Sequence, residues 1–393
     1  MAADARSRLF RWKDPYDTQG TEALFLEAMR ENAAFQADHC PAYRAILDEY
    51  GFSPEELQTP ADLARLPAIP TAFFKKRRMF SLPESRRIVT ATSSGTGEGR
   101  TSEIGLECGA LLAGARMVWK VCAPRGLISP RPSHYVIFGY EPGHGNTMAA
   151  AKTAFGYTFL APAVTRTYAL RWDRKQGTFV PDLGGVIRSV VRLAKSPFPT
   201  RFMGFPAYTY FALKRMEASG LAVRMPAGSS VMLGGGWKQH YRERADKEEM
   251  YVLIRRTLGI PESSVFESYG AAEHPILYCD CPAHHFHVPV YSRVIIRDPR
   301  TLEPLPMGEP GLVNLLTPMI YATPVLSVLT DDLGVLHPAS GPDCPGGCPC
   351  GVQSPWLEIL GRAGLGEIRT CAAGAEAVLA QSTEAAALPG EGR

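Results

Sequence analysis

The sequence contains no apolar run that approaches the roughly 18 residues of a membrane-spanning helix. Its first residues, MAADARSRLFRWKD, also lack the apolar stretch of a secretory signal peptide. Neither sign of charge dominates, since 42 Lys and Arg residues stand against 39 Asp and Glu residues and leave a formal net charge of +3. Such a balance produces no strong field for nucleic acid or for an anionic membrane. We therefore predict a soluble cytoplasmic protein that binds no nucleic acid.

Apolar residues are abundant enough for a large core, since 45% of the 393 residues are hydrophobic. Residues 1–65 are predicted to form a helical N-terminal extension. From residue 66 onward, short apolar runs of strand type alternate with helical stretches, which predicts an α/β fold with mixed sheets covered by helices. Residues 286–360 carry strands separated by turns and are expected to form a smaller β-rich part. We predict one large domain over residues 66–362 and a short tail over residues 363–393.

Nine cysteines are distributed unevenly along the chain. Five of them lie between Cys279 and Cys350, Cys371 stands alone near the end, and the other three are scattered. This distribution is not that of a disulfide framework. It predicts buried thiols in a reducing compartment, a metal site and one separate thiol.

A loop rich in glycine, serine and threonine occupies residues 92–97 (TSSGTG). Glycine lets backbone amide groups approach the oxygens of a phosphate, and the hydroxyl groups add further donors. The loop is not a Walker loop, because no Gly-Lys-Ser/Thr follows it. Taken alone, a polar hairpin loop explains the stretch equally well.

This loop is the first of four motifs in a fixed order, which continues with residues 268–273 (SYGAAE), 329–334 (LTDDLG) and 360–362 (LGR). The series resembles the acyl-adenylate-forming superfamily, whose signatures are a Ser/Thr/Gly loop, Y-G-x-x-E, T-G-D and G-R. Other segments resemble its acyl-protein synthetase (LuxE-type) and phenylacetate–CoA ligase-like branch. These segments are Ile69-Pro70, Phe74-Lys75, and residues 234–238 (GGGWK), 308–312 (GEPGL) and 348–351 (CPCG).

The resemblance implies the large N-terminal domain of the adenylate-forming fold. It also implies that ATP, with Mg²⁺, activates a carboxylic acid as acyl-AMP, whose acyl group then passes to a thiol. The residues that would hold the phosphates of ATP, or let the backbone approach the nucleotide, are Ser93, Ser94, Gly95, Thr96, Gly97, Gly234, Gly235 and Gly236.

By the same resemblance, Tyr269 and Gly270 would flank the adenine, and Glu273 would bind Mg²⁺, which prefers carboxylate oxygen. Asp332 would accept hydrogen bonds from the ribose, and Arg362 would contact the ribose or a phosphate.

Each of these side chains also has an ordinary structural interpretation. Tyr269 would be a core aromatic residue, and Glu273 an acid at the start of a helix. Asp332 would be a turn residue, and Arg362 would pair with Glu358.

The C-terminal segment departs from the pattern of longer relatives, which continue past the G-R motif into a lid domain that carries a lysine. Here 31 residues follow Arg362 and none is a lysine, so we expect the lid domain to be largely missing. The segment does contain residues 366–371 (GEIRTC), and acyl-protein synthetases carry a similar cysteine near the C-terminus. This likeness predicts that the Cys371 thiolate accepts the acyl group and passes it to a partner protein. An incidental small residue in a loose tail is the alternative.

Two other functions stay open at this point. The chain would be an acid–CoA or carrier-protein ligase of the phenylacetate type, or an inactive nucleotide-binding scaffold. The acyl-accepting partner would be a reductase or a carrier protein, and a homodimer is possible at the level of the family.

Two clusters of soft ligands, in residues 279–287 and 343–351, predict a structural zinc site. Phenylacetate–CoA ligase relatives have a similar pairing of cysteine and histidine with C-x-C-G. By that likeness the ligands are Cys281, His287, Cys348 and Cys350, for which Cys279 and Cys344 are possible substitutes. The alternative is a cluster of free thiols.

We expect the acyl pocket after a strand end, near residues 138–140 (FGY) and His144. Phe205, Tyr208 and Tyr210 either line this pocket or fill the core. No charged pocket signature stands out, so we predict a fatty or aryl acid as the substrate.

Overall fold

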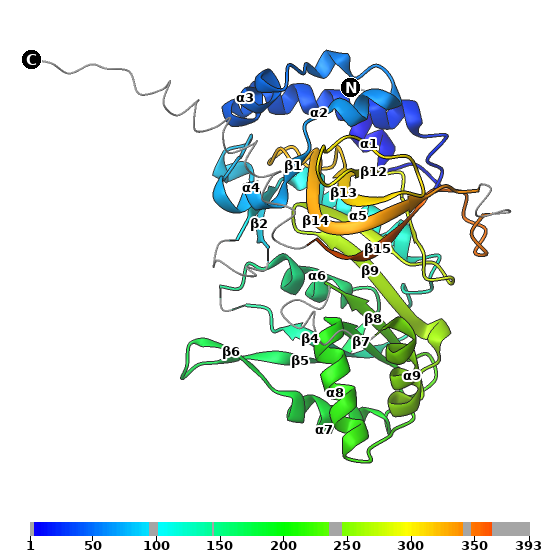
Figure 1. Ribbon diagram of the computed structural model, residues 1–393. Coiled ribbons are helices and arrows are strands. Elements are labelled where there is room, and N and C mark those ends of the chain that lie inside the picture. The colour runs from blue at the N-terminus through cyan, green and yellow to red at the C-terminus, as the bar shows by residue number, and fades with distance from the viewer. Residues whose placement is uncertain (1–3, 94–100, 144, 236–245, 341–346, 364–393) are drawn as a thin grey trace, which may run out of the picture.

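Two large sheets and their helices organise the chain in the computed structural model, which describes residues 4–93, 101–143, 145–235, 246–340 and 347–363. Three N-terminal helices lie at one end, a six-stranded sheet lies beneath them, and a seven-stranded sheet forms the opposite end (Figure 1). The predicted α/β fold with a β-rich part is confirmed.

The seven-stranded sheet has the order β10-β9-β8-β7-β4-β5-β6. Its central strands are parallel, and the edge strands β6 and β10 are antiparallel to their neighbours. Parallel strands are covered on both faces, which explains why β4 is almost continuously apolar and buried. The strands are β4 (Ser133–Tyr140), β5 (Ala163–Asp173), β6 (Thr178–Pro181), β7 (Thr200–Gly204), β8 (Ser230–Gly234), β9 (Val265–Ala271) and β10 (His274–Cys279).

Helices α7 (Leu183–Leu193), α8 (Pro206–Ala218) and α9 (Lys247–Leu258) pack together on this sheet. Their apolar residues and those of β4, β7 and β8 form one core, which includes Val190, Leu213 and Ile254.

The six-stranded sheet is antiparallel except at β1, which runs parallel to β14. Its strands are β1 (Ile69–Pro70), β11 (Phe286–His287), β12 (Arg293–Arg297), β13 (Pro310–Leu316), β14 (Ser327–His337) and β15 (Trp356–Arg362). The pairing of Ile69 with Val328 places the start of helix α4 (Thr71–Lys76) beside the T-D-D motif.

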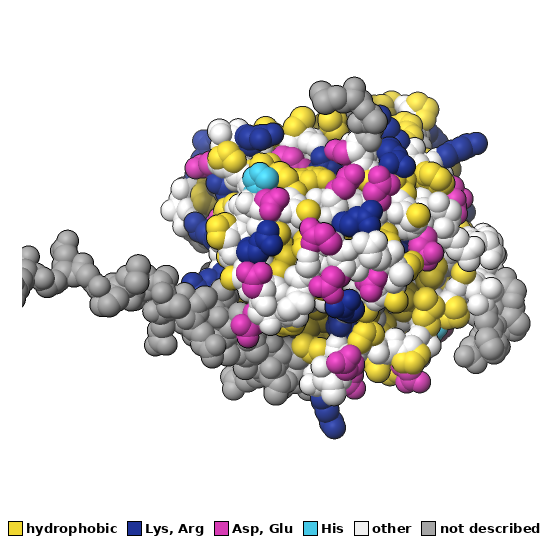
Figure 2. Space-filling view, turned by 90° about the horizontal axis from the view of Figure 1, so that it is seen from above, with side chains coloured by type: hydrophobic (Ala, Val, Ile, Leu, Met, Phe, Trp, Pro, Cys, Tyr) yellow, Lys and Arg dark blue, Asp and Glu magenta, His cyan; other side chains and the backbone are white. Residues whose placement is uncertain are grey.

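The N-terminal helices α1 (Ala5–Leu9), α2 (Glu22–His39) and α3 (Pro41–Glu49) share a core with the β-rich part. The Phe10 ring stacks on Tyr291 with a centroid distance of 4.6 Å. The buried Asn32 amide donates hydrogen bonds to the carbonyl groups of Pro318 and Ile320, at 2.8 and 2.9 Å. Figure 2 shows this end from above, with acidic and basic side chains interspersed across it.

Helix α2 gives way to α3 at Cys40, because Pro41 cannot donate the hydrogen bond that would continue α2. The following residues form short 3₁₀ helices, η1 (Pro54–Glu56) and η2 (Pro60–Arg65). No helix in the described part of the chain combines the length and apolar character needed to cross a membrane.

The remaining elements lie around the space between the two large sheets. They are the hairpin β2 (Val89–Thr92) and β3 (Glu103–Leu106), the helices α5 (Cys108–Cys122) and α6 (Ala149–Tyr157), and the short helices η3 (Glu84–Arg86) and η5 (Glu262–Ser264). Helix α5 packs on β10.

Candidate active site

A cavity of about 1520 Å³ brings together parts of all four sequence motifs. Single-ligand pockets commonly measure about 300–1,000 Å³, so this one has room for a nucleotide and a second group. Residues at the carboxyl ends of parallel strands line it, as α/β sheets commonly arrange their ligand sites. The lining residues from the motifs are Ser93, Tyr269, Gly270, Glu273, Asp331, Asp332 and Arg362.

Glu273 lies in the turn between β9 and β10, and not at the start of a helix. Its side chain is 4% exposed and accepts a hydrogen bond from the Ser102 hydroxyl group. Burial raises the pKa of Glu273, while the Ser102 hydroxyl and the Lys75 ammonium group act in the opposite direction. No described residue forms an ion pair with this carboxylate, so it has the chemistry of a cation ligand facing the cavity.

Tyr269, Asp332 and Arg362 form a contiguous group on β9, β14 and β15. The Tyr269 hydroxyl donates to Asp332 Oδ2 at 3.0 Å, and Arg362 Nε lies 3.5 Å from Asp332 Oδ1. Asp332 is paired with Arg362 in the antiparallel register of β14 and β15, which sets this contact. The anticipated alternative partner of Arg362, Glu358, instead contacts His337 at 2.9 Å.

Burial also determines the charge states in this group. It raises the pKa of Tyr269 well above its ordinary value, and the adjacent Asp332 carboxylate adds to the shift, so the phenol stays protonated and donates. Burial raises the pKa of Asp332, whereas Arg362 lowers it. The aspartate is thus a partly buried acceptor held between two donors.

Gly234 and Gly235 line the cavity where β8 ends. A Cβ atom on Gly234 would lie 2.4 Å from the Ser268 hydroxyl oxygen, so a side chain does not fit there. Gly235 has a φ of 81°, which favours glycine. The backbone can therefore approach a ligand closely at both positions.

Several predicted site residues lie outside the described residues, so the structure says nothing of their placement. They are Ser94, Gly95, Thr96, Gly97, His144, Gly236, Cys344 and Cys371.

Apolar residues form another wall of the cavity, from α5, α6 and the sheet. Gly139, Tyr140 and Phe205 line it as expected, whereas Tyr208 and Tyr210 do not. Phe138 is 1% exposed and belongs to the core beneath α7 and α8. The further apolar lining residues include Leu111, Val118, Ala154, Tyr157, Met203 and Met232.

Two residues beside Glu273 were not assigned a role from the sequence. Lys75 entered only as part of a family-like dipeptide, yet it lines the cavity and forms no ion pair with a described residue. No sequence pattern marks Ser102. A serine after a glycine-rich loop gives no indication that its hydroxyl group contacts Glu273, which lies 171 positions away.

Cys281, His287, Cys348 and Cys350 lie together, with their ligand atoms all within 4.8 Å of one another. The Cys281 and Cys348 sulfur atoms are 3.6 Å apart, and Cys350 Sγ lies 3.2 Å from His287 Nε2. These separations suit a tetrahedral zinc ion, because Zn–S bonds of about 2.3 Å place neighbouring ligands roughly 3.5–3.8 Å apart.

The surroundings of the cluster also match a metal site. His287 Nδ1 lies 3.0 Å from the Ser354 carbonyl oxygen, which fixes the proton on Nδ1 and leaves Nε2 as the ligand atom. Backbone amides of Ala283 and Val352 donate to the sulfur atoms of Cys281 and Cys350, at 3.3 and 3.5 Å.

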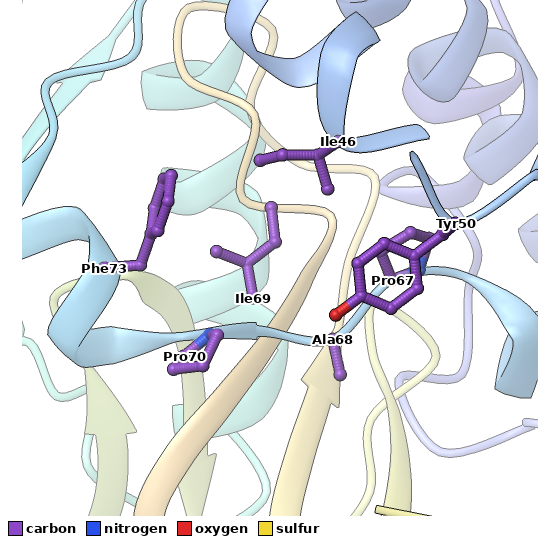
Figure 3. Close-up of a pocket in the computed structure, with 7 residues that line it drawn as sticks. All are labelled: Ile46, Tyr50, Pro67, Ala68, Ile69, Pro70 and Phe73. Carbon is purple, nitrogen blue, oxygen red and sulfur yellow. The ribbon is translucent and has the colours of Figure 1, made fainter. Parts of the chain in front are cut away.

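A second, small recess lies between α3 and the β1–α4 connection (Figure 3). Its volume is about 10 Å³, and its lining residues, which include Ile46, Ile69 and Phe73, are mostly apolar. Such a space is barely large enough for one water molecule and offers few polar partners. We therefore interpret it as a packing gap.

Comparison with solved structures identifies the fold. An open conformation of 2-hydroxyisobutyryl-CoA ligase, solved in complex with 2-HIB-AMP and CoA, superposes with a TM-score of 0.65 and 17% identity, covering 92% of this chain and 79% of that one. The postadenylation state of the same ligase gives the same TM-score at 16% identity, covering 92% of this chain and 72% of that one.

Sequence comparison finds two kinds of relative. A long-chain-fatty-acid–luciferin-component ligase of Vibrio harveyi is 24% identical over 72% of each chain. A phenylacetate-coenzyme A ligase of Aromatoleum evansii is 25% identical over 80% of this chain and 66% of the relative. This chain thus spans about two thirds of the length of that phenylacetate ligase.

Fold, cavity and relatives together define the class as an acid–thiol ligase of the acyl-adenylate-forming superfamily. Within that class, the sequence model of one family, "Acyl-protein synthetase, LuxE", matches residues 6–380. The chain belongs to the acyl-protein synthetase LuxE family.

The buried charge of Glu273 predicts an effect on stability. Because burial raises the pKa of Glu273, its ionised form destabilises the fold at neutral pH. We expect Glu273→Gln to raise the thermal midpoint at pH 7 by about 1–3 °C. This gain should disappear as the pH falls through the raised pKa, because the wild-type carboxyl group is then neutral as well.

Thermal unfolding followed by circular dichroism over a pH series would measure this effect. Exposed Glu303→Gln serves as the control and should change little at any pH. A lower midpoint for Glu273→Gln at pH 7 would contradict the electrostatic argument.

Proposed function

We propose that this chain uses ATP to activate a fatty or aryl acid as acyl-AMP, passes the acyl group to the Cys371 thiol, and then delivers it to a partner protein. The observation that carries the proposal is the single cavity that joins a nucleotide-like polar end to an apolar wall. In the first step a carboxylate oxygen attacks the α-phosphorus of ATP and pyrophosphate leaves. In the second step the thiolate attacks the acyl carbonyl carbon and AMP leaves.

The polar end suits the nucleotide. The carboxylate of Asp332 is positioned by Tyr269 to accept hydrogen bonds from ribose hydroxyl groups. Arg362, which is about half exposed, would contact the ribose or a phosphate. The close backbone approach at Gly234 and Gly235 would add amide donors for the phosphates.

Glu273 would hold Mg²⁺, since it is a cavity-lining carboxylate without an ion-pair partner among the described residues. When bound, the cation would supply positive charge that offsets the repulsion between the attacking carboxylate and the triphosphate. Lys75 would contribute charge of the same sign from α4.

The acyl end favours an apolar acid. Its lining by Leu111, Val118, Met203 and Met232 offers a large apolar contact area. The names of the relatives, a long-chain-fatty-acid ligase and phenylacetate ligases, support a fatty or an aryl acid.

Acid-dependent exchange of labelled pyrophosphate into ATP tests the first step. A panel of short, long-chain and aryl acids should give exchange with at least one apolar acid and with none of the polar control acids. Tight ATP binding without exchange for any acid would favour an inactive scaffold.

Cys371 is within reach of the site by chain length alone. It stands eight positions beyond Ala363, the last described residue, and eight residues span at most about 29 Å. Arg362, immediately before Ala363, already lines the cavity. An acyl acceptor at position 371 therefore needs no separate docking domain.

Labelling identifies the acceptor. With a radioactive acid and ATP, the enzyme should acquire a hydroxylamine-sensitive acyl label that Cys371→Ala removes by more than tenfold, whereas pyrophosphate exchange should change less than twofold. Cys108→Ala, at an exposed cysteine, is the control. Retained labelling in Cys371→Ala would disprove the proposal, and a CoA-dependent product would favour the CoA ligase suggested by the phenylacetate relatives.

We further propose a structural zinc ion bound by Cys281, His287, Cys348 and Cys350. All four protein ligands are present, so the ion would have no open position for catalysis. It would join the turn after β10 to the loop before β15, and so fix the two large sheets to each other. The free thiols elsewhere suit a reducing compartment, which supports a cytoplasmic location.

Metal analysis of the purified protein should find about one zinc ion per chain. Cys348→Ser should lose the ion and lower the thermal midpoint by about 5 °C or more, because the binding energy of a structural zinc is also folding energy. Cys108→Ser should retain it. A chain that is fully folded and free of zinc after metal-replete expression would refute the site.

A further inference from the structure

Ser102 connects the phosphate loop with the carboxylate of Glu273. It is completely buried and immediately precedes β3. Its backbone nitrogen donates to Ser93 Oγ at 3.0 Å, and its carbonyl oxygen accepts from the Ser93 backbone nitrogen at 3.1 Å. We call this pair, Ser93 and Ser102, the serine clasp.

The serine clasp continues the hairpin ladder beyond the pairing of Thr92 with Glu103. It therefore fixes the two residues from which the chain enters and leaves the loop. Ser93 lines the cavity, and its oxygen accepts the Ser102 amide hydrogen. The hydroxyl hydrogen of Ser93 then stays available as a donor toward the cavity.

The Ser102 side chain makes a third hydrogen bond, in which its hydroxyl group donates to Glu273 Oε1. No other described side chain donates a hydrogen bond to this carboxylate. The neighbouring charges are Lys75 on α4 and Asp331 on β14, which have opposite effects on the pKa of Glu273. Neither of them fixes the orientation of the carboxylate, because neither is hydrogen-bonded to it.

A carboxylate held at one oxygen is oriented for a ligand at the other. Ser102 donates to Oε1, no other described side chain donates a hydrogen bond to the carboxylate, and the one further hydrogen bond comes from the backbone amide of Glu273 itself. The carboxylate lines the cavity, where it can bind a cation. The residue that orients this carboxylate also fixes the entry to the phosphate loop.

We propose that Ser102 is a positioning residue for binding of the metal–nucleotide complex, because it orients the Glu273 carboxylate and fixes Ser93 through one set of hydrogen bonds. The inference rests on the proposed ATP-dependent function. It goes further by assigning a role to a residue outside the recognised motifs.

Binding of Mg-ATP, measured by calorimetry, tests the assignment without relying on turnover. Ser102→Ala should weaken binding roughly tenfold or more, because the Glu273 carboxylate would no longer be oriented before the metal–nucleotide complex binds. Ser102→Thr, which keeps the hydroxyl group, should restore most of the affinity. Ser133→Ala removes another buried serine hydroxyl, remote from the cavity at the start of β4, and should bind as the wild type does.

A double-mutant cycle separates positioning from general damage to the fold. In a Glu273→Gln background, Ser102→Ala should cause little additional loss of Mg-ATP affinity, because its route through the carboxylate is already removed. The thermal midpoint of Ser102→Ala should itself fall, because the mutation removes a hydrogen bond to a buried carboxylate, so binding is compared well below the midpoints of all variants. Unchanged Mg-ATP affinity in Ser102→Ala, or full additivity in the cycle, would overturn the proposal.

The failure of this inference differs from failure of the proposed function. If Ser102→Ala weakens Mg-ATP binding but the wild type shows no acid-dependent exchange, the positioning role is supported and acid activation is contradicted. If the wild type shows acid-dependent exchange but Ser102→Ala binds Mg-ATP as tightly as the wild type, acid activation is supported and the positioning role is contradicted.

Discussion

The hydrogen bond from Tyr269 to Asp332 lies at the junction of the two large sheets, since Tyr269 belongs to β9 and Asp332 to β14. In both strands, buried residues give way to partly exposed ones at this point, and both Tyr269 and Asp332 line the cavity. The register of β14 with β15 then brings Arg362 to the same aspartate. Motifs nearly 100 positions apart in the sequence thus meet at the partly buried carboxylate of Asp332.

This arrangement has an electrostatic consequence for the whole cavity. Glu273 is a buried acid and Asp332 a partly buried one, both with raised pKa values, and Asp331 lies close enough to raise the pKa of Glu273. A group of carboxylates in one cavity is unfavourable for folding but favourable for a ligand that brings cations and hydrogen-bond donors. Lys75 offsets part of the charge, and the proposed Mg²⁺ would offset more. The fold therefore sacrifices some stability at the site that we propose for the nucleotide.

The cysteine–histidine cluster also lies between the two large sheets. Cys281 follows β10 of the seven-stranded sheet, His287 lies in β11 of the six-stranded sheet, and Cys348 and Cys350 precede β15 of that same sheet. The N-terminal helices share a core with the β-rich part. The proposed zinc ion would fix the relative placement of the two sheets, and hence the shape of the cavity.

The order of the motifs determined much of this protein at the level of sequence. The ordered motifs, with the resemblance they carry, predicted the fold class and the family. They also grouped Glu273, Asp332 and Arg362 as one site, and all three line the same cavity in the structure. The likeness to phenylacetate–CoA ligase relatives likewise selected Cys281, His287, Cys348 and Cys350, whose side chains lie together in the structure. Tertiary structure alone decided that Arg362 contacts Asp332 and not Glu358, since strand register is set by pairing across the sheet. It alone revealed the contact of Ser102 with Glu273, because a hydrogen bond between residues distant in sequence follows from how the hairpin packs against β9 and β10, and no local pattern records that packing.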